Sequence, residues 1–160
     1  MTDSAHSVDG VTIVATLEEE GVTPSQLRVI AENWSRAGRF ERAEAVYRSA
    51  LAASSDPIET MYSQRGLANM LFDADREGQG REAYRVALDI ARTHSSHPEW
   101  DAAETLRRWA DWEGALSDDV EARRLLGLTT DCALKSRKSS SPRRALAEDR
   151  GGRSETRSSA

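Results

Sequence analysis

Residues 23–51 read TPSQLRVIAENWSRAGRFERAEAVYRSAL, and this stretch decides the fold. It begins like a helix N-terminus, with the hydroxyl of Thr23 as a cap, a proline at the first helical position and Gln26 at the third. Apolar residues then recur at helical spacing on both sides of Gly38, a residue type that commonly ends a helix. The stretch therefore predicts two consecutive helices joined by a tight turn.

Three further helix starts follow along the chain. Asp56-Pro57 repeats the arrangement of cap and proline, Ser96 and Glu99 have the spacing of a capping box, and Ser117 to Asp119 place a hydroxyl and two carboxylates at a helix N-terminus. Apolar residues keep the helical period between these starts. We expect six helices in three hairpins, with residues 8–20 as a further element that is a short extra helix or the alternating stretch Val11–Val14.

A short motif recurs at repeat-scale spacing. Tyr47 and Tyr84 each begin the pattern Tyr-Arg-x-Ala-Leu, 37 residues apart (84 − 47). The first unit resembles a tetratricopeptide repeat, since the family's signature offsets hold Leu27, Ile30, Ala31, Trp34, Gly38, Phe40, Ala43, Tyr47, Ala50 and Leu51. The second unit departs from the pattern at Asp75 and Glu77. The third fits loosely, through Trp109, Ala110, Ala122 and Leu126.

This resemblance implies an all-α fold, a short α-solenoid of antiparallel helical hairpins, over residues 24–134. The alternative is an irregular helical bundle with chance matches to the repeat. Residues 1–23 form an N-terminal segment. Residues 135–160 hold eight Lys or Arg and three Asp or Glu, a net charge of +5, which leaves −10 on residues 1–134. Because this Ser-rich and Gly-rich tail has few large apolar residues, we expect it to be disordered.

Composition and motifs argue against several functional classes. The sequence has no apolar stretch of membrane-spanning length and no signal peptide, and its one cysteine, Cys132, suits a reducing compartment, so we expect a cytoplasmic protein. Glycine-rich phosphate loops and the common hydrolase and metalloprotease motifs are missing from the sequence. His94 and His97 lie in a turn without the further ligands that a zinc site needs. We therefore expect no catalysis, no cofactor and no metal.

The tryptophans divide between packing and exposure. Trp34 and Trp109 occupy core offsets of the repeat. Trp100 and Trp112 share a helix with Trp109 at spacings that cannot all fall on one narrow stripe, so at least one of them is expected to be half exposed. An exposed tryptophan can anchor a partner, or it can cover the free face of the last repeat.

A ladder of arginines is the main functional signal. In tetratricopeptide proteins the first helix of each repeat lines a concave groove, and Arg28, Arg65 and Arg107 each lie three residues before the signature alanine. Guanidinium groups in a row can bind a carboxylate or an acidic peptide. Alternatively, these arginines form ordinary surface pairs within their helices, such as Arg28 with Glu32.

Asn69 cannot neutralise Arg65, so Arg65 is expected to face solvent as the most available of the three arginines. The pair Arg65 and Asn69 resembles one corner of the carboxylate clamp of chaperone-binding tetratricopeptide domains, although Glu32 departs from that clamp. The candidate groove residues are Arg28, Tyr62, Arg65, Asn69, Arg107 and Arg108.

We therefore expect a non-catalytic interaction module that binds a partner segment, acidic in the first hypothesis, in the groove of the solenoid. The rival hypothesis is binding of nucleic acid or another anionic surface through the basic tail. The acidic body and the lack of aromatic residues in the tail argue against nucleic acid. In a third alternative the tail folds back on the body and inhibits it.

Overall fold

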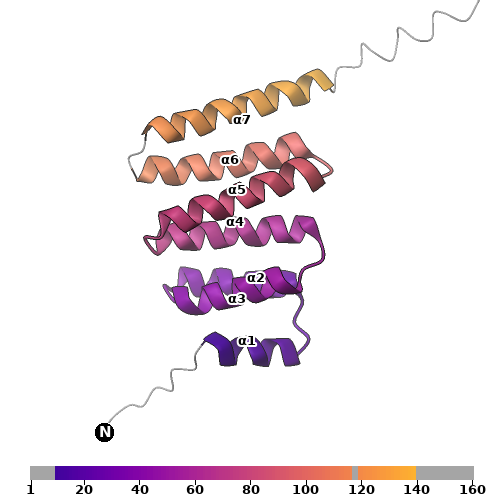
Figure 1. The fold of residues 1–160 in the computed structure, drawn as a ribbon, viewed down its shortest axis with the longest axis vertical. Helices are drawn as coiled ribbons and strands as arrows, with labels where there is room; N and C mark the ends of the chain where they lie inside the picture. The colour runs from indigo at the N-terminus through magenta and orange to yellow at the C-terminus, as the bar shows by residue number, and fades with distance from the viewer. Residues whose placement is uncertain (1–9, 117–118, 140–160) are drawn as a thin grey trace, which may run out of the picture.

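The computed structural model describes residues 10–116 and 119–139, and these residues form seven helices without a strand (Figure 1). The helices are α1 (Gly10–Glu19), α2 (Pro24–Arg36), α3 (Phe40–Ala53), α4 (Pro57–Asp73), α5 (Glu77–His94), α6 (Pro98–Ala115) and α7 (Asp119–Ser139). The fold is all-α, as the sequence predicts.

Of the four predicted helix starts, two caps are confirmed and one is wrong, while the cap at Ser117 lies outside the described residues. Thr23 and Gln26 form the capping box of α2, in which the Thr23 N–H donates to Gln26 Oε1 at 2.9 Å. Asp56 Oδ1 accepts from the N–H of Ile58 at 2.9 Å and caps α4. The box predicted at Ser96 is wrong, because His97 is the N-cap residue of α6 and makes no side-chain capping bond.

From α2 onward the helices follow the chain order through the structure, with α2 and α3 overlapping in the view of Figure 1. Each of α2 to α6 packs on the next helix. In addition, α2 contacts α4 and α4 contacts α6, so these three helices lie along one side of the stack. At the N-terminal end, α1 packs on α3. This arrangement is compatible with a helical-repeat fold.

The core contains the small and aromatic residues that the repeat pattern predicts. Ala31 and Ala43 are fully buried, as are Tyr47 and Tyr84, the two residues that begin the recurring motif. Small residues at these positions allow neighbouring helices to approach closely. The prediction of a core position for Leu126 is wrong, because its side chain is exposed, whereas Ala122 and Leu125 of the same helix are buried.

The two ends of the chain differ from the predicted boundaries. A helix, α1, occupies part of the N-terminal segment, where the alternating stretch Val11–Val14 could also have been a strand. At the other end, α7 runs to Ser139, so the expectation of disorder from residue 135 is wrong for residues 135–139. The rest of the predicted tail, 140–160, lies outside the described residues. None of the described helices is long and apolar enough to span a membrane.

Candidate functional site

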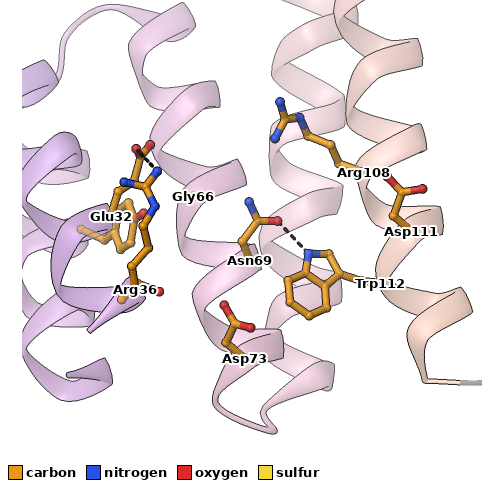
Figure 2. A pocket seen from close by; sticks show the side chains of 10 residues that line it. Glu32, Arg36, Gly66, Asn69, Asp73, Arg108, Asp111 and Trp112 are labelled. Atoms are coloured by element: carbon orange, nitrogen blue, oxygen red, sulfur yellow. Dashed lines mark hydrogen bonds and ion pairs between the residues drawn. The ribbon is translucent and has the colours of Figure 1, made fainter. Parts of the chain in front are cut away.

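A groove of about 520 Å³ crosses three helices on the side of the stack where α2, α4 and α6 lie (Figure 2). We call it the α2–α4–α6 groove. One further helix contributes through a single side chain, Tyr47 of α3. The residues that line the groove are Glu32, Ser35, Arg36, Tyr47, Gly66, Asn69, Asp73, Arg108, Asp111 and Trp112.

Tyr47 and Gly66 form part of the groove lining where α3 meets α4. A Cβ atom on Gly66 would lie 2.6 Å from the hydroxyl oxygen of Tyr47, so only glycine leaves room for the phenol. The Tyr47 side chain is 1% exposed, and its hydroxyl makes no hydrogen bond with a described residue. Burial raises the pKa of this phenol, so the hydroxyl stays protonated. It is therefore a neutral group with a free donor and a free acceptor.

Asn69 is held in one orientation by two donors. Its side-chain oxygen accepts from Trp112 Nε1 at 2.8 Å, across the α4–α6 contact, and from the hydroxyl of Tyr84. Because the indole N–H of Trp112 can only donate, it requires the amide oxygen on that side, and the amide nitrogen must point the other way. Figure 2 shows this nitrogen directed into the groove between α2 and α6. No described residue accepts from it, so the groove contains a fixed and unused N–H donor.

Most of the charged groups in the groove already have partners. Glu32 pairs with Arg28 at 2.9 Å and with Arg36 at 3.6 Å. Asp111 accepts from Arg107 at 3.0 Å. Each of these pairs joins residues four apart in one helix.

Arg108 is the cation on the α6 side of the groove. Its Nε donates to Glu104 at 2.7 Å, which engages one edge of the guanidinium. Figure 2 shows the guanidinium facing the space across from α2. Its terminal nitrogens make no hydrogen bond with a described residue, so they remain able to donate to a ligand.

Asp73 is the exception among the acids of the groove. It is the last residue of α4 and has no ion pair or hydrogen bond with a described residue. Loss of solvent around the carboxylate raises its pKa. A carboxylate at a helix C-terminus also meets the negative end of the helix dipole, which is unfavourable. Nothing in the described protein compensates this charge.

Two of the six residues predicted from the sequence, Asn69 and Arg108, line the groove. Arg28 lies beside it and joins α2 to α4 through a hydrogen bond from Nε to Glu59 Oε1 at 2.8 Å. Burial acts to lower the pKa of Arg28, but its bonds to Glu59 and Glu32 outweigh that effect and raise it. Tyr62 is exposed on α4, with the Arg28 guanidinium 5.8 Å from its ring centroid.

The expectation that Arg65 faces solvent is wrong. Its side chain is buried between α4 and α6, where Nη2 donates to the backbone oxygen of Asp101 at 2.6 Å and Nε donates to Thr105 Oγ1 at 2.8 Å. Burial lowers the pKa of Arg65, and the nearby Asp101 carboxylate partly offsets this. Sequence offered no warning, because the partners of Arg65 lie 36 and 40 residues away.

Arg107 is exposed and pairs within its own helix, with Glu104 and Asp111, as the surface-pair alternative predicts. The three arginines of the predicted ladder therefore occupy three different environments. None of them lines the groove.

Several groove residues were missed at the sequence level. Arg36 and Asp73 were not singled out, although Asp73 lies four residues after Asn69 on the same helix, whereas Trp112 was named only as a candidate exposed anchor. Tyr47 was interpreted only as a core residue. Gly66, in the middle of a helix, was the clearest neglected signal, because an interior glycine often marks a close approach.

Other candidate sites offer less. His94 and His97 are exposed, and the described part of the chain contains no group of three or more metal-ligating side chains. Trp109 is buried against Tyr84, with ring centroids 5.8 Å apart, whereas Trp100 is 65% exposed near the start of α6. Cys132 lies in the part of α7 whose side chains are not described.

No model of a known protein family, no characterised protein and no solved structure matches this chain.

Proposed function

We propose that this protein is a short tetratricopeptide-like solenoid that binds an extended segment of a partner protein in the α2–α4–α6 groove, without catalysis of its own. In this assignment α2, α4 and α6 are the first helices of three hairpins. The observation that carries the proposal is the pair of unused polar groups in the groove, the Tyr47 hydroxyl and the Asn69 amide nitrogen.

The packing supports the repeat assignment. Each hairpin contacts the next, and the first helices of successive hairpins also contact one another. Residues at equivalent positions have equivalent burial, as Ala31, Ala68 and Ala110 are all in the core. A repeat of this kind exposes the faces of its first helices along one surface, where extended segments can lie.

The unused polar groups support binding of a main chain. Peptide carbonyls and N–H groups need partners whatever the side chains are, and the groove offers a donor at Asn69 and both a donor and an acceptor at Tyr47. Both groups are rigidly held before a ligand arrives, Tyr47 by burial and Asn69 by Trp112 and Tyr84. Preorganised groups lose little entropy on binding, which favours affinity.

The test is selection of peptides from a displayed random library by the full-length protein. We expect wild type to enrich a family of related sequences. Ser35→Trp, which fills the groove with an indole, should abolish their binding, whereas Ser25→Trp on the exposed N-terminal turn of the same helix should not. A chain lacking residues 140–160 should bind as wild type does.

Two results would contradict the proposal. Selection without any enriched family, or enriched peptides that ignore Ser35→Trp, would exclude the groove as a peptide site. Binding lost only when residues 140–160 are removed would assign the function to the basic tail instead.

A further inference from the structure

We propose that the end of the groove formed by Asp73 and Trp112 holds a lysine or arginine side chain of the bound segment. This assignment deepens the proposed function and rests on it. It changes the expected partner from an acidic segment to one that carries a positive charge.

The first reason is that Asp73 is an exposed carboxylate without a counter-charge among the described residues. It ends α4 at the negative end of the helix dipole, and α4 has no basic residue in its last turn to offset it. Partial desolvation of the carboxylate also raises its pKa, although the residue is exposed to solvent. A cation from a ligand would supply the missing counter-charge.

The second reason is the contrast with the other acids of the groove. Glu32 already pairs with two arginines, and Asp111 pairs with Arg107. The lining carries three acidic and two basic side chains, a net charge of −1 (2 − 3). The net charge of the lining therefore disfavours an acidic segment. Asp73 is the lining carboxylate that remains available to pair with a basic side chain of a ligand.

The third reason is the ring of Trp112, which lines the same end of the groove (Figure 2). Phe72 stacks on one face of the ring, with centroids 5.5 Å apart and planes at 10°, and this contact holds the indole in place. A cation near an indole face is attracted by the ring, and arginine also stacks on it. Asp73 and Trp112 together offer a carboxylate and an aromatic ring to a cationic side chain.

The neighbouring groups fit the main chain of the same ligand. The Asn69 nitrogen and the Tyr47 hydroxyl lie in the same groove, and Tyr47 is 1% exposed with its hydroxyl unpartnered. A segment that donates its side chain to Asp73 can therefore place a carbonyl oxygen at Asn69. Trp112 contributes to both the main-chain contact at Asn69 and the cation contact at Asp73. Its Nε1–H fixes the Asn69 amide, and its ring lines the end of the groove that would hold the cation.

The experiment uses an oriented peptide library on the full-length protein, with one position fixed in turn as Arg, Lys, Leu or Glu. We expect wild type to favour Arg or Lys at one position. Asp73→Asn should reduce that preference about tenfold, the loss given by one partly desolvated charge pair. Asp75→Asn makes the same charge change two residues away, outside the groove lining. Asparagine tolerates the positive φ of 57° at Asp75, so this control should keep the preference.

A second readout separates loss of the subsite from loss of fold. Because Asp73 lacks a partner, Asp73→Asn should leave the free energy of unfolding unchanged or slightly higher in urea titration. Groove-bound peptides with no preference for a basic residue, or a preference for Glu, would overturn the inference and leave the proposed function standing. If no peptide binds in the groove at all, both are wrong.

Discussion

Arg28 of α2 and Arg65 of α4, each three residues before a buried alanine, form two different ion pairs. In the N-terminal part, Arg28 joins α2 to α4 through Glu59, and the two side chains remain 21% and 19% exposed. In the C-terminal part, Arg65 joins α4 to α6 at Asp101, and the side chains are only 7% and 9% exposed. Both arginines stand three residues before a buried alanine, so the difference comes from the helix that each one meets.

A second pair of contacts shows the same division. Glu44 of α3 pairs with Arg76, the residue before α5, in a contact that is open to solvent on the arginine side. Glu113 of α6 is fully buried and receives both Arg81, at 2.8 and 2.7 Å, and Trp109 Nε1 at 2.6 Å. The carboxylates that hold α6 in place are therefore the ones most removed from water.

This contrast shows that arginines at matching helix positions can contribute very different amounts to the free energy of unfolding. An exposed ion pair contributes about 0 to 1 kcal/mol to the free energy of unfolding, because water screens the pair and solvates either charge when the other is removed. A buried charge that loses its partner is left desolvated without compensation, at a cost of about 3 to 5 kcal/mol. We expect the α4–α6 contact to be much less tolerant of substitution than the α2–α4 contact.

The largest expected effect is that of Arg65→Ala. It leaves the Asp101 carboxylate buried without a counter-charge and removes hydrogen bonds to Thr105 and to the backbone, so it should lower the free energy of unfolding by about 3 to 5 kcal/mol. Urea denaturation measures this. Arg65→Lys should recover only part of the loss, because lysine lacks the fork that reaches both partners. A loss below about 1 kcal/mol would mean that Arg65 faces solvent after all.

Gly66→Ala tests how closely α3 and α4 pack, in the part of the protein whose ion pair is the more exposed. The new Cβ would displace the Tyr47 ring, whose hydroxyl would lie 2.6 Å away, and overpacking of this kind costs about 1 to 3 kcal/mol. Gly78→Ala is the matched control, since its Cβ would meet nothing within 4 Å. Equal thermal melting of the two variants would contradict the close approach of α3 and α4.

Arg28→Ala should have a smaller effect than either. Its partners Glu59 and Glu32 keep contact with water, so we expect a loss of about 1 kcal/mol or less. Measured side by side with Arg65→Ala, it gives the contrast between the two contacts directly. Losses of similar size would remove the distinction between them.

The smallest expected effect concerns pH. The hydrogen bond from Arg76 holds the pKa of Glu44 below its ordinary value, with Arg48 adding to the shift. A depressed folded-state pKa stabilises the protein above the unfolded-state pKa, and this contribution disappears as the pH falls through the folded-state pKa. Glu44→Gln should therefore lose stability at pH 7 but little at pH 3, which urea titrations at the two pH values compare.

The sequence was sufficient for the elements because caps and helical periods are local signals. Thr23, Asp56 and the prolines after them marked helix starts correctly, and the burial of Ala31, Tyr47 and Tyr84 followed from the repeat pattern. Local signals predicted the C-terminal boundary of the folded part less well. Residues 135–139 are helical although their composition is that of a disordered segment, because they continue a helix that is already formed.

The candidate site was only partly predictable, because its geometry depends on pairs far apart in the sequence. Whether an arginine faces the groove or is buried depends on residues of the next hairpin, and nothing near Arg65 indicated Thr105 as its partner. Asn69 was identified for a different reason from the one the structure gives. It matters through the nitrogen that Trp112 and Tyr84 leave free, rather than through a failure to neutralise Arg65.

The indole of Trp112 gives the unlabelled protein an optical reporter. Indole emission shifts with the polarity of its surroundings, and of the four tryptophans only Trp112 lines the groove. Trp109 is buried and stacked on Tyr84, so its emission is insulated from events at the surface. Trp100 is 65% exposed and contributes a constant red-shifted background, which Trp100→Phe would remove. A blue shift in that variant would then report the fraction of grooves that are occupied, in plain buffer and without a label.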